Sequence, residues 1–211
     1  MNLDEIVLIP ESDRNSSWEN QFFQALAEGN IQLISTDTQT GPDGWPYILA
    51  ETGPDAKEPA AKLLSWLAER GIGLAINPRK EYPDYVFSYG MLWSFKETGY
   101  FFKHLPDRPE GMVQFEPKSL VHTGPPTEEF LPGYVKKVLR DFFRDQSILL
   151  PKIQVISQDQ VNYDLAISLD SLGNPPESEH EGIAEAISWF LPPHYSLLLI
   201  NEAGMPPFFD L

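Results

Sequence analysis

The stretch Asp55–Pro78 combines a helix, a stop signal and a short buried strand. Asp55 and Glu58 have the spacing of a capping box, in which an acceptor and a Glu three residues later satisfy free N–H groups at a helix start. Gly71 is expected to end the helix in the left-handed conformation, and Ile72–Ile76 is short and apolar enough for a buried strand. The helix between them has apolar residues at i, i+3, i+4 and i+7, which are Ala60, Leu63, Leu64 and Leu67. A helix that leads directly into a buried strand predicts an α/β unit.

Further amphipathic helices and apolar strands are predicted on both sides of this stretch. The expected helices cover residues 16–29, 132–145 and 178–190, and the first and last begin with the capping-box patterns Ser16–Glu19 and Ser178–Glu181. Residues 91–102 fit a strand or a helix equally well. The expected strands are Glu5–Ile9, Ile31–Thr36, Trp45–Ala50, Tyr85–Tyr89, Gly111–Phe115, Ser119–His122, Ile153–Ile156, Tyr163–Leu169 and Tyr195–Ile200.

Two of these strands have an expected place in their sheets. Pro46 lies near the start of Trp45–Ala50 and favours an edge position, because proline cannot donate to a strand ladder. Tyr195–Ile200 is a continuous apolar run, which is typical of a central strand that is buried on both faces.

The turn-rich segment Thr123–Thr127 interrupts the alternation of helices and strands. We therefore expect one domain over residues 1–123 and a second over residues 124–211. The expected fold class is α/β (α+β), with two small mixed-sheet domains whose helices pack on one face.

The net charge of −16 is distributed unevenly along the chain. Residues 1–56 hold ten acids and one base, residues 57–152 hold twelve acids and fourteen bases, and residues 153–211 hold nine acids with no Lys or Arg. Acidic surfaces repel nucleic acid and anionic lipid but attract cationic proteins. We expect a protein partner with a basic surface, no nucleic acid and no membrane. Solubility alone is the alternative explanation for this charge.

The sequence contains no cysteine, which excludes disulfides and thiolate chemistry. No run approaches the roughly 20 apolar residues of a membrane span. The acidic start of the chain differs from the basic start of a signal peptide, so the expected location is the cytoplasm.

The expected partner-binding residues lie at the start of the last helix and are Glu177, Glu179, Glu181 and Glu185. A basic partner would relieve the repulsion between these carboxylates. The basic helix face at Lys136, Arg140 and Arg144 is a competing source of neutralising charge within the same chain.

Other possible sites are less specific, and none yields catalytic, cofactor-binding or metal-ligating residues. His180 and Glu181 resemble part of a metal-binding helix, but Ala184 occupies the position of the second histidine. A hydrolase using His104 or His122 remains an alternative. The cationic pair Arg79 and Lys80 could bind an anion or an acidic peptide, but with so many acids in the chain we expect internal or solvated pairing instead. The aromatic-rich segment Tyr82–Phe102 fits either a binding groove or a core.

Several pieces of the chain resemble the bacterial SseB family, named for enhanced serine sensitivity. These pieces are Phe22–Leu26, Ile31–Ser35, Leu63–Pro78 with its Gly-Leu-Ala-Ile-Asn-Pro end, Leu120–Pro126 leading into the helix Gly133–Asp145, Tyr195–Ile200 and Pro207–Phe209. Tyr82–Phe102 and the loop before Lys57 depart from the family pattern. The resemblance implies N- and C-terminal domains and a non-enzymatic cytoplasmic protein, with relatives sometimes encoded near secretion or toxin systems. An immunity protein that binds a toxin is therefore a further alternative.

Overall fold

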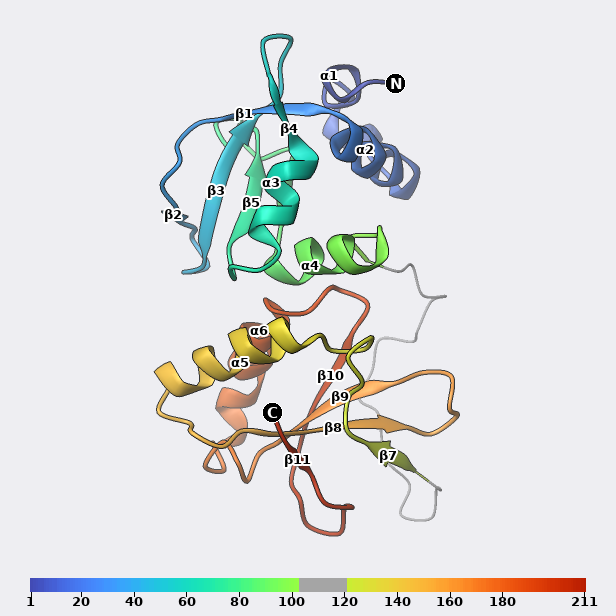
Figure 1. Ribbon diagram of the computed structural model, residues 1–211, viewed down its shortest axis with the longest axis vertical. Helices are drawn as coiled ribbons and strands as arrows, with labels where there is room; N and C mark the ends of the chain where they lie inside the picture. The colour runs from blue at the N-terminus through green and yellow to red at the C-terminus, as the bar shows by residue number, and fades with distance from the viewer. Residues whose placement is uncertain (103–120) are drawn as a thin grey trace. The chain divides into compact units, whose positions relative to one another are not determined.

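The computed structural model describes residues 1–102 and 121–211 (Figure 1). The chain divides into two compact units, Met1–Phe102 (unit 1) and Lys103–Leu211 (unit 2). Each unit contains helices and one mixed sheet, so the predicted α/β class is confirmed. No helix in the described parts of the chain is long and apolar enough to cross a membrane.

Unit 1 is built on a six-stranded sheet with the order β4-β1-β3-β5-β6, in which β2 also pairs with β3. β3 and β5 are parallel, and the remaining pairs are antiparallel. The strands are β1 (Asn30–Leu33), β2 (Gln39–Thr40), β3 (Pro46–Glu51), β4 (Glu58–Pro59), β5 (Gly73–Ile76) and β6 (Tyr85–Phe87). The helices are α1 (Leu3–Ile6), the 3-10 turn η1 (Glu11–Asp13), α2 (Ser16–Glu28), α3 (Ala60–Leu67) and α4 (Tyr89–Thr98).

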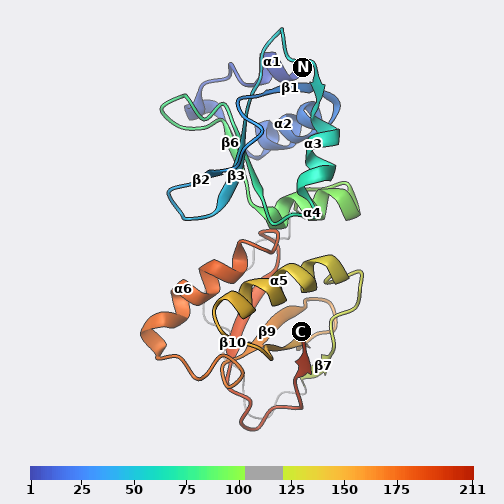
Figure 2. The ribbon, with the colours of Figure 1, turned by 60° about the vertical axis from the view of Figure 1, so that its left-hand side comes forward.

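The core of unit 1 lies between its sheet and α2, α3 and α4, which Figure 2 shows on one side of β3 and β6. Phe22 of α2 is fully buried, stacks on Trp18 at a ring distance of 5.0 Å and lies 5.5 Å from the Tyr85 ring. Leu64 and Leu67 of α3 are also fully buried. Val86, between the inward residues of β6, is exposed, as expected for a strand with one covered face.

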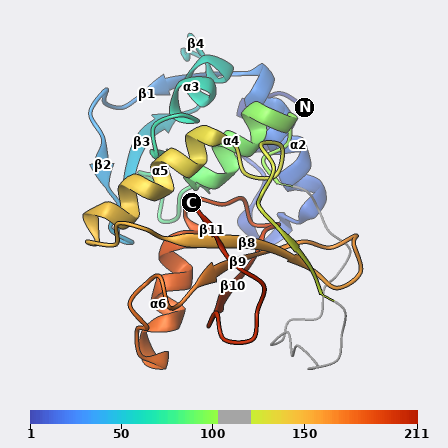
Figure 3. The ribbon, with the colours of Figure 1, turned by 60° about the horizontal axis from the view of Figure 1, so that its bottom comes forward.

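Unit 2 has a five-stranded sheet with the order β10-β9-β8-β11, in which β7 also pairs with β8 (Figure 3). β9 and β10 are parallel and the other pairs are antiparallel. The strands are β7 (His122–Gly124), β8 (Lys152–Ser157), β9 (Asp164–Ser168), β10 (Ser196–Ile200) and β11 (Phe209–Asp210). The helices are α5 (Gly133–Asp145) and α6 (Glu177–Ser188), and the Phe142 and Phe190 rings lie 5.2 Å apart.

The two units share one order of elements, α-β-β-α-β. In unit 1 it runs α2-β1-β3-α3-β5, with the short strands β2 and β4 inserted, and in unit 2 it runs α5-β8-β9-α6-β10. In both, the first strand is antiparallel to the second, which a helix connects to a parallel third strand. Both third strands end in Ile-Asn, at Ile76-Asn77 and Ile200-Asn201. The units differ in the fourth strand, because β6 pairs with the third strand β5 whereas β11 pairs with the first strand β8.

The predicted helix starts are partly wrong. The Asp55–Glu58 capping box does not form, because Glu58 and Pro59 make strand β4 beside β1 and the helix begins at Ala60. The Ser178–Glu181 box is also wrong, since α6 begins one residue earlier, at Glu177, without a side-chain cap. In α2 the capping residue is Asn15, whose Oδ1 accepts from the backbone N–H groups of Ser17 and Trp18.

The expected strand Glu5–Ile9 is wrong, because this segment starts inside helix α1. Asn2 and Glu5 form a capping box there, with the Asn2 side chain accepting the Glu5 N–H at 2.9 Å. A cap at the very start of the chain thus outweighs the β-branched residues that follow. Residues 91–102, which fitted a strand or a helix, contain most of α4.

Both predictions about strand position are wrong. β3 lies inside its sheet, between β1 and β5, and Pro46 is tolerated at its first residue. β10 lies at an edge and is half-buried along its whole length. The boundary expected after residue 123 falls within β7, which pairs with β8 of unit 2. Gly111–Phe115 lies outside the described residues, as does the first half of Ser119–His122.

Candidate functional site

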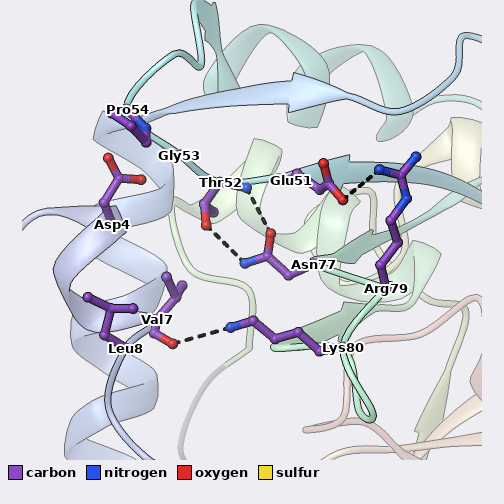
Figure 4. Close-up of a pocket in the computed structure, with 10 residues that line it drawn as sticks. All are labelled: Asp4, Val7, Leu8, Glu51, Thr52, Gly53, Pro54, Asn77, Arg79 and Lys80. Carbon is purple, nitrogen blue, oxygen red and sulfur yellow. Dashed lines mark hydrogen bonds and ion pairs between the residues drawn. The ribbon is translucent and has the colours of Figure 1, made fainter.

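Unit 1 has a pocket of about 470 Å³ at the carboxyl ends of the parallel strands β3 and β5, beside α1 (Figure 4). Ligands of open α/β sheets commonly bind at this end of the strands, which makes the pocket a candidate site. It is lined by Asp4, Val7, Leu8, Glu51, Thr52, Gly53, Pro54, Asn77, Arg79 and Lys80.

Asn77 connects the ends of the two parallel strands. Its Oδ1 accepts the Thr52 backbone N–H at 2.8 Å, and its Nδ2 donates to the Thr52 hydroxyl at 2.9 Å and to Asp84 at 2.5 Å. The residue is buried and has a φ of 53°, a left-handed conformation that Asn tolerates better than most residues. The Asn77 side chain therefore joins the end of β5 to Thr52, the residue that follows β3.

Asp84 lies beneath the pocket with a side chain that is 1% exposed. Arg14 donates to its Oδ1 at 2.7 Å, and Lys80 donates to its Oδ2 at 2.6 Å. Burial by itself raises the pKa of this carboxyl, but the hydrogen bonds from Lys80, Asn77 and Arg14 outweigh it and hold the pKa below its ordinary value. Asp84 is thus ionised at neutral pH, and both of its carboxylate oxygens accept hydrogen bonds.

Arg14 joins this network to the start of the chain. Its guanidinium also donates to the carbonyl oxygens of Val7 at 3.2 Å and Ile9 at 3.1 Å, and it lies 4.5 Å from the centre of the Trp18 ring. The network therefore fastens α1 and α2 to the loop before β6. Its polar groups bind one another, which indicates a structural function.

The cations Arg79 and Lys80 pair with acids of their own unit. Arg79 contacts Glu51 at 3.2 Å, and Lys80 is held by Asp84. Within the described pocket lining, Thr52 carries the one hydroxyl and is already bound to Asn77. The pocket thus lacks a nucleophile with an adjacent base among these residues.

The four expected partner-binding glutamates, Glu177, Glu179, Glu181 and Glu185, lie along α6. All four side chains are exposed, and no ion pair to any of them occurs in the described part of the chain. Neighbouring His180 faces the Pro175 carbonyl, 3.0 Å from its Nε2. Among the described residues, no group of three His, Asp or Glu side chains is placed to hold a metal ion.

Three of the four bases of α5 pair with nearby acids in the described part of the chain. Lys136 pairs with Glu128 at 3.0 Å, and Asp141 pairs with Lys137 at 3.2 Å and with Arg144 at 2.8 Å. These local contacts lower the pKa of Glu128 and of Asp141, chiefly through the lysine hydrogen bonds. Lys136, Lys137 and Arg144 therefore pair with acids close to α5, and none of these ion pairs involves a glutamate of α6.

The histidine alternatives have different outcomes. His104 lies outside the described residues. His122 lines a second pocket of about 330 Å³ in unit 2, where its Nε2 lies 2.8 Å from Gln160 Nε2. The described lining of this pocket contains no carboxylate and consists of His122, Thr123, Gly124, Pro125, Thr127, Phe130, Val155 and Tyr163. No acid–base pair is therefore assembled among these residues.

The aromatic residues of Tyr82–Phe102 supply much of the core of unit 1. Phe87 and Phe101 are buried with ring centroids 4.7 Å apart, and Phe95 stacks on Phe101 at 4.4 Å. Tyr82 and Tyr100 are exposed at the surface. Asp84 was not identified from the sequence as the centre of a network. The one related feature in the sequence is that Arg14 is the single base among residues 1–56.

The chain was compared with protein-family models, curated proteins and solved structures, and none of them matches it. The resemblance to the SseB family therefore stays a prediction from the sequence.

Proposed function

We propose that this protein is a non-enzymatic, SseB-like binding protein whose acidic surface on α6 receives a partner protein with a basic surface. The observation that carries the proposal is the set of four exposed glutamates on α6, which form no ion pair within the described residues, while Lys136, Lys137 and Arg144 of α5 pair locally. A cluster of exposed acids accelerates the approach of a basic partner, and binding relieves the repulsion between the acids.

The proposal places this binding in the cytoplasm. It rests on the acidic start of the chain, which differs from the basic start of a signal peptide. An immunity protein is a special case of the same function, in which the basic partner is a toxin.

The test is a comparative pull-down from an extract of the native cell with three immobilised proteins. The first is the wild type, and the second carries Glu177→Gln, Glu179→Gln, Glu181→Gln and Glu185→Gln (the α6 variant). The third carries Glu11→Gln, Glu28→Gln, Asp55→Asn and Glu81→Gln (the unit 1 control), which removes four exposed acids and so changes the net charge equally.

We expect a basic protein to be retained by the wild type and the unit 1 control but lost from the α6 variant. The reason is that the attraction depends on where the charges lie, over a Debye length of about 8–10 Å. Equal retention by all three proteins would refute α6 as the binding surface. Equal loss from both variants would also refute it, because retention would then depend on net charge and not on where the acids lie.

A further inference from the structure

β10 is an edge strand with one free side in the described part of unit 2. All five of its residues, Ser196–Ile200, pair in parallel with β9, and no described strand pairs with its other side. The Ile200 carbonyl oxygen accepts the Leu169 N–H at 2.9 Å, so the backbone groups of Ile200 face β9. Because these groups alternate along a strand, the N–H and C=O groups of Leu197 and Leu199 face outward.

The other described sheet ends are short, and two of them carry residues that discourage further pairing. β4 consists of Glu58 and Pro59, β11 of Phe209 and Asp210, and β6 has three residues. β10 has five residues with no proline and no charge. Proteins protect exposed edges with short strands, prolines and charges, and an unprotected apolar edge is a template for another strand.

Unit 1 shows what fits on this edge, because its equivalent strand is covered. β5 corresponds to β10 in the shared α-β-β-α-β order, and its outer side is paired with the antiparallel strand β6. In unit 2 the fourth strand β11 pairs with β8 at the far side of the sheet, and the corresponding place beside β10 holds no described strand.

The surroundings of β10 indicate the chemistry of the strand that would occupy this place. α6, with its four exposed glutamates, packs against β10, and Asp170 follows the end of β9. Glu202, which follows β10, is paired with Lys152 at 3.6 Å and so adds less to the local negative charge. Residues 153–211 contain no Lys or Arg. A second copy of this chain would bring its own nine acids to the same place, which opposes pairing of β10 with β10.

We propose that β10 binds an extended, lysine- or arginine-containing segment of the partner protein as an added antiparallel strand. This inference rests on the proposed function and specifies its binding mode: main-chain hydrogen bonds to Leu197 and Leu199 supply one part of the affinity, and the α6 glutamates attract the basic side chains. Leu198 and Ile200 pack against the cluster of Ile156, Ala166 and Phe208, which holds the receiving strand in place.

The experiment uses the full chain and a capped nine-residue peptide of alternating valine and lysine, with affinity measured by fluorescence anisotropy at low and moderate salt. The matched probe is the same peptide with N-methyl groups on its five central amides, which keeps the charge but removes the strand donors. We expect the methylated peptide to bind at least about tenfold more weakly at both salt concentrations. Loss of these hydrogen bonds is a short-range effect, whereas the α6 contribution shrinks as salt rises.

A protein variant tests the same edge from the other side. Leu199→Pro removes an outward N–H, a change that edge strands tolerate, and Leu199→Ala is its control for the lost side chain. We expect Leu199→Pro to bind the unmethylated peptide at least about fivefold more weakly than Leu199→Ala does, because only the former loses a strand donor.

The outcomes separate the two proposals. Equal binding of the two peptides would overturn strand addition, and the proposed function would survive if the α6 variant still bound both more weakly. Equal binding by the α6 variant and the unit 1 control would overturn the proposed function instead. A wild-type dimer in sedimentation velocity that Leu199→Pro abolishes would assign the edge to a second copy and overturn the basic-partner inference.

Discussion

Replacing Asp84 with Asn is expected to lower the free energy of unfolding by about 3–5 kcal/mol, the usual cost of removing one partner from a buried ion pair. Asn has nearly the same shape, so the loss arises from charge: the largely buried Arg14 loses its counter-ion, and Asn77 Nδ2 can meet another amide donor. Chemical denaturation monitored by tryptophan fluorescence measures the change. The control is Glu51→Gln, which removes the partner of Arg79, a side chain that is 70% exposed, and should cost at most about 1 kcal/mol. Equal effects of the two substitutions would contradict the buried network.

The ionisation of Asp84 makes the free energy of unfolding depend on pH. Its pKa in the folded protein lies below the ordinary value of 3.8, so the stabilisation is present above that value and is lost as pH falls through the lower, folded-state pKa. The stability advantage of the wild type over Asp84→Asn should therefore be constant near neutral pH and shrink in acid below about pH 4. Denaturation midpoints measured from pH 7 to pH 2 test this, and an advantage that does not change with pH would contradict it.

The substitution Leu64→Ala is expected to cost about 2–5 kcal/mol, because it leaves a cavity between α3 and the sheet. Leu64 is fully buried, whereas the adjacent Ser65 is exposed and provides the control Ser65→Ala on the same helix. Unfolding of both variants by urea gives the comparison. If Leu64→Ala has the midpoint of the wild type, the buried face of α3 is assigned wrongly.

Local patterns predicted the long helices well. α2 and α5 follow their apolar repeats, and the step from α3 through Gly71, which has a φ of 68°, into β5 was predicted from neighbouring residues alone. Capping boxes were less informative, because an Asp or Ser followed by Glu three residues later also occurs where other structure forms. Glu58 is such a case: it and Pro59 pair with Ile31 and Asn30 of β1, and a pattern within residues 55–58 cannot show a contact with a strand so much earlier in the chain.

The order of strands within a sheet depends on contacts that the sequence pattern does not contain. The apolar run Ser196–Ile200 fitted a central strand, but the fourth strand β11 pairs with β8, and β10 is left at the edge. The Asp84 network could not be predicted for the same reason, because Arg14 and Asp84 are 70 residues apart in the sequence. The glutamates of α6 were chosen as partner-binding residues from the charge pattern alone. They are exposed because the apolar face of this helix is narrow.

The central claim is that the four exposed glutamates of α6 attract a basic partner, and the association rate measures this attraction most directly. Stopped-flow binding of a partner recovered by pull-down is compared for the wild type, the α6 variant and the unit 1 control across a salt series. The account predicts that the α6 variant associates several-fold more slowly at low salt, that the unit 1 control changes less, and that all three rates converge as salt rises. Association rates that are the same for the wild type and the α6 variant at every salt concentration would contradict the claim.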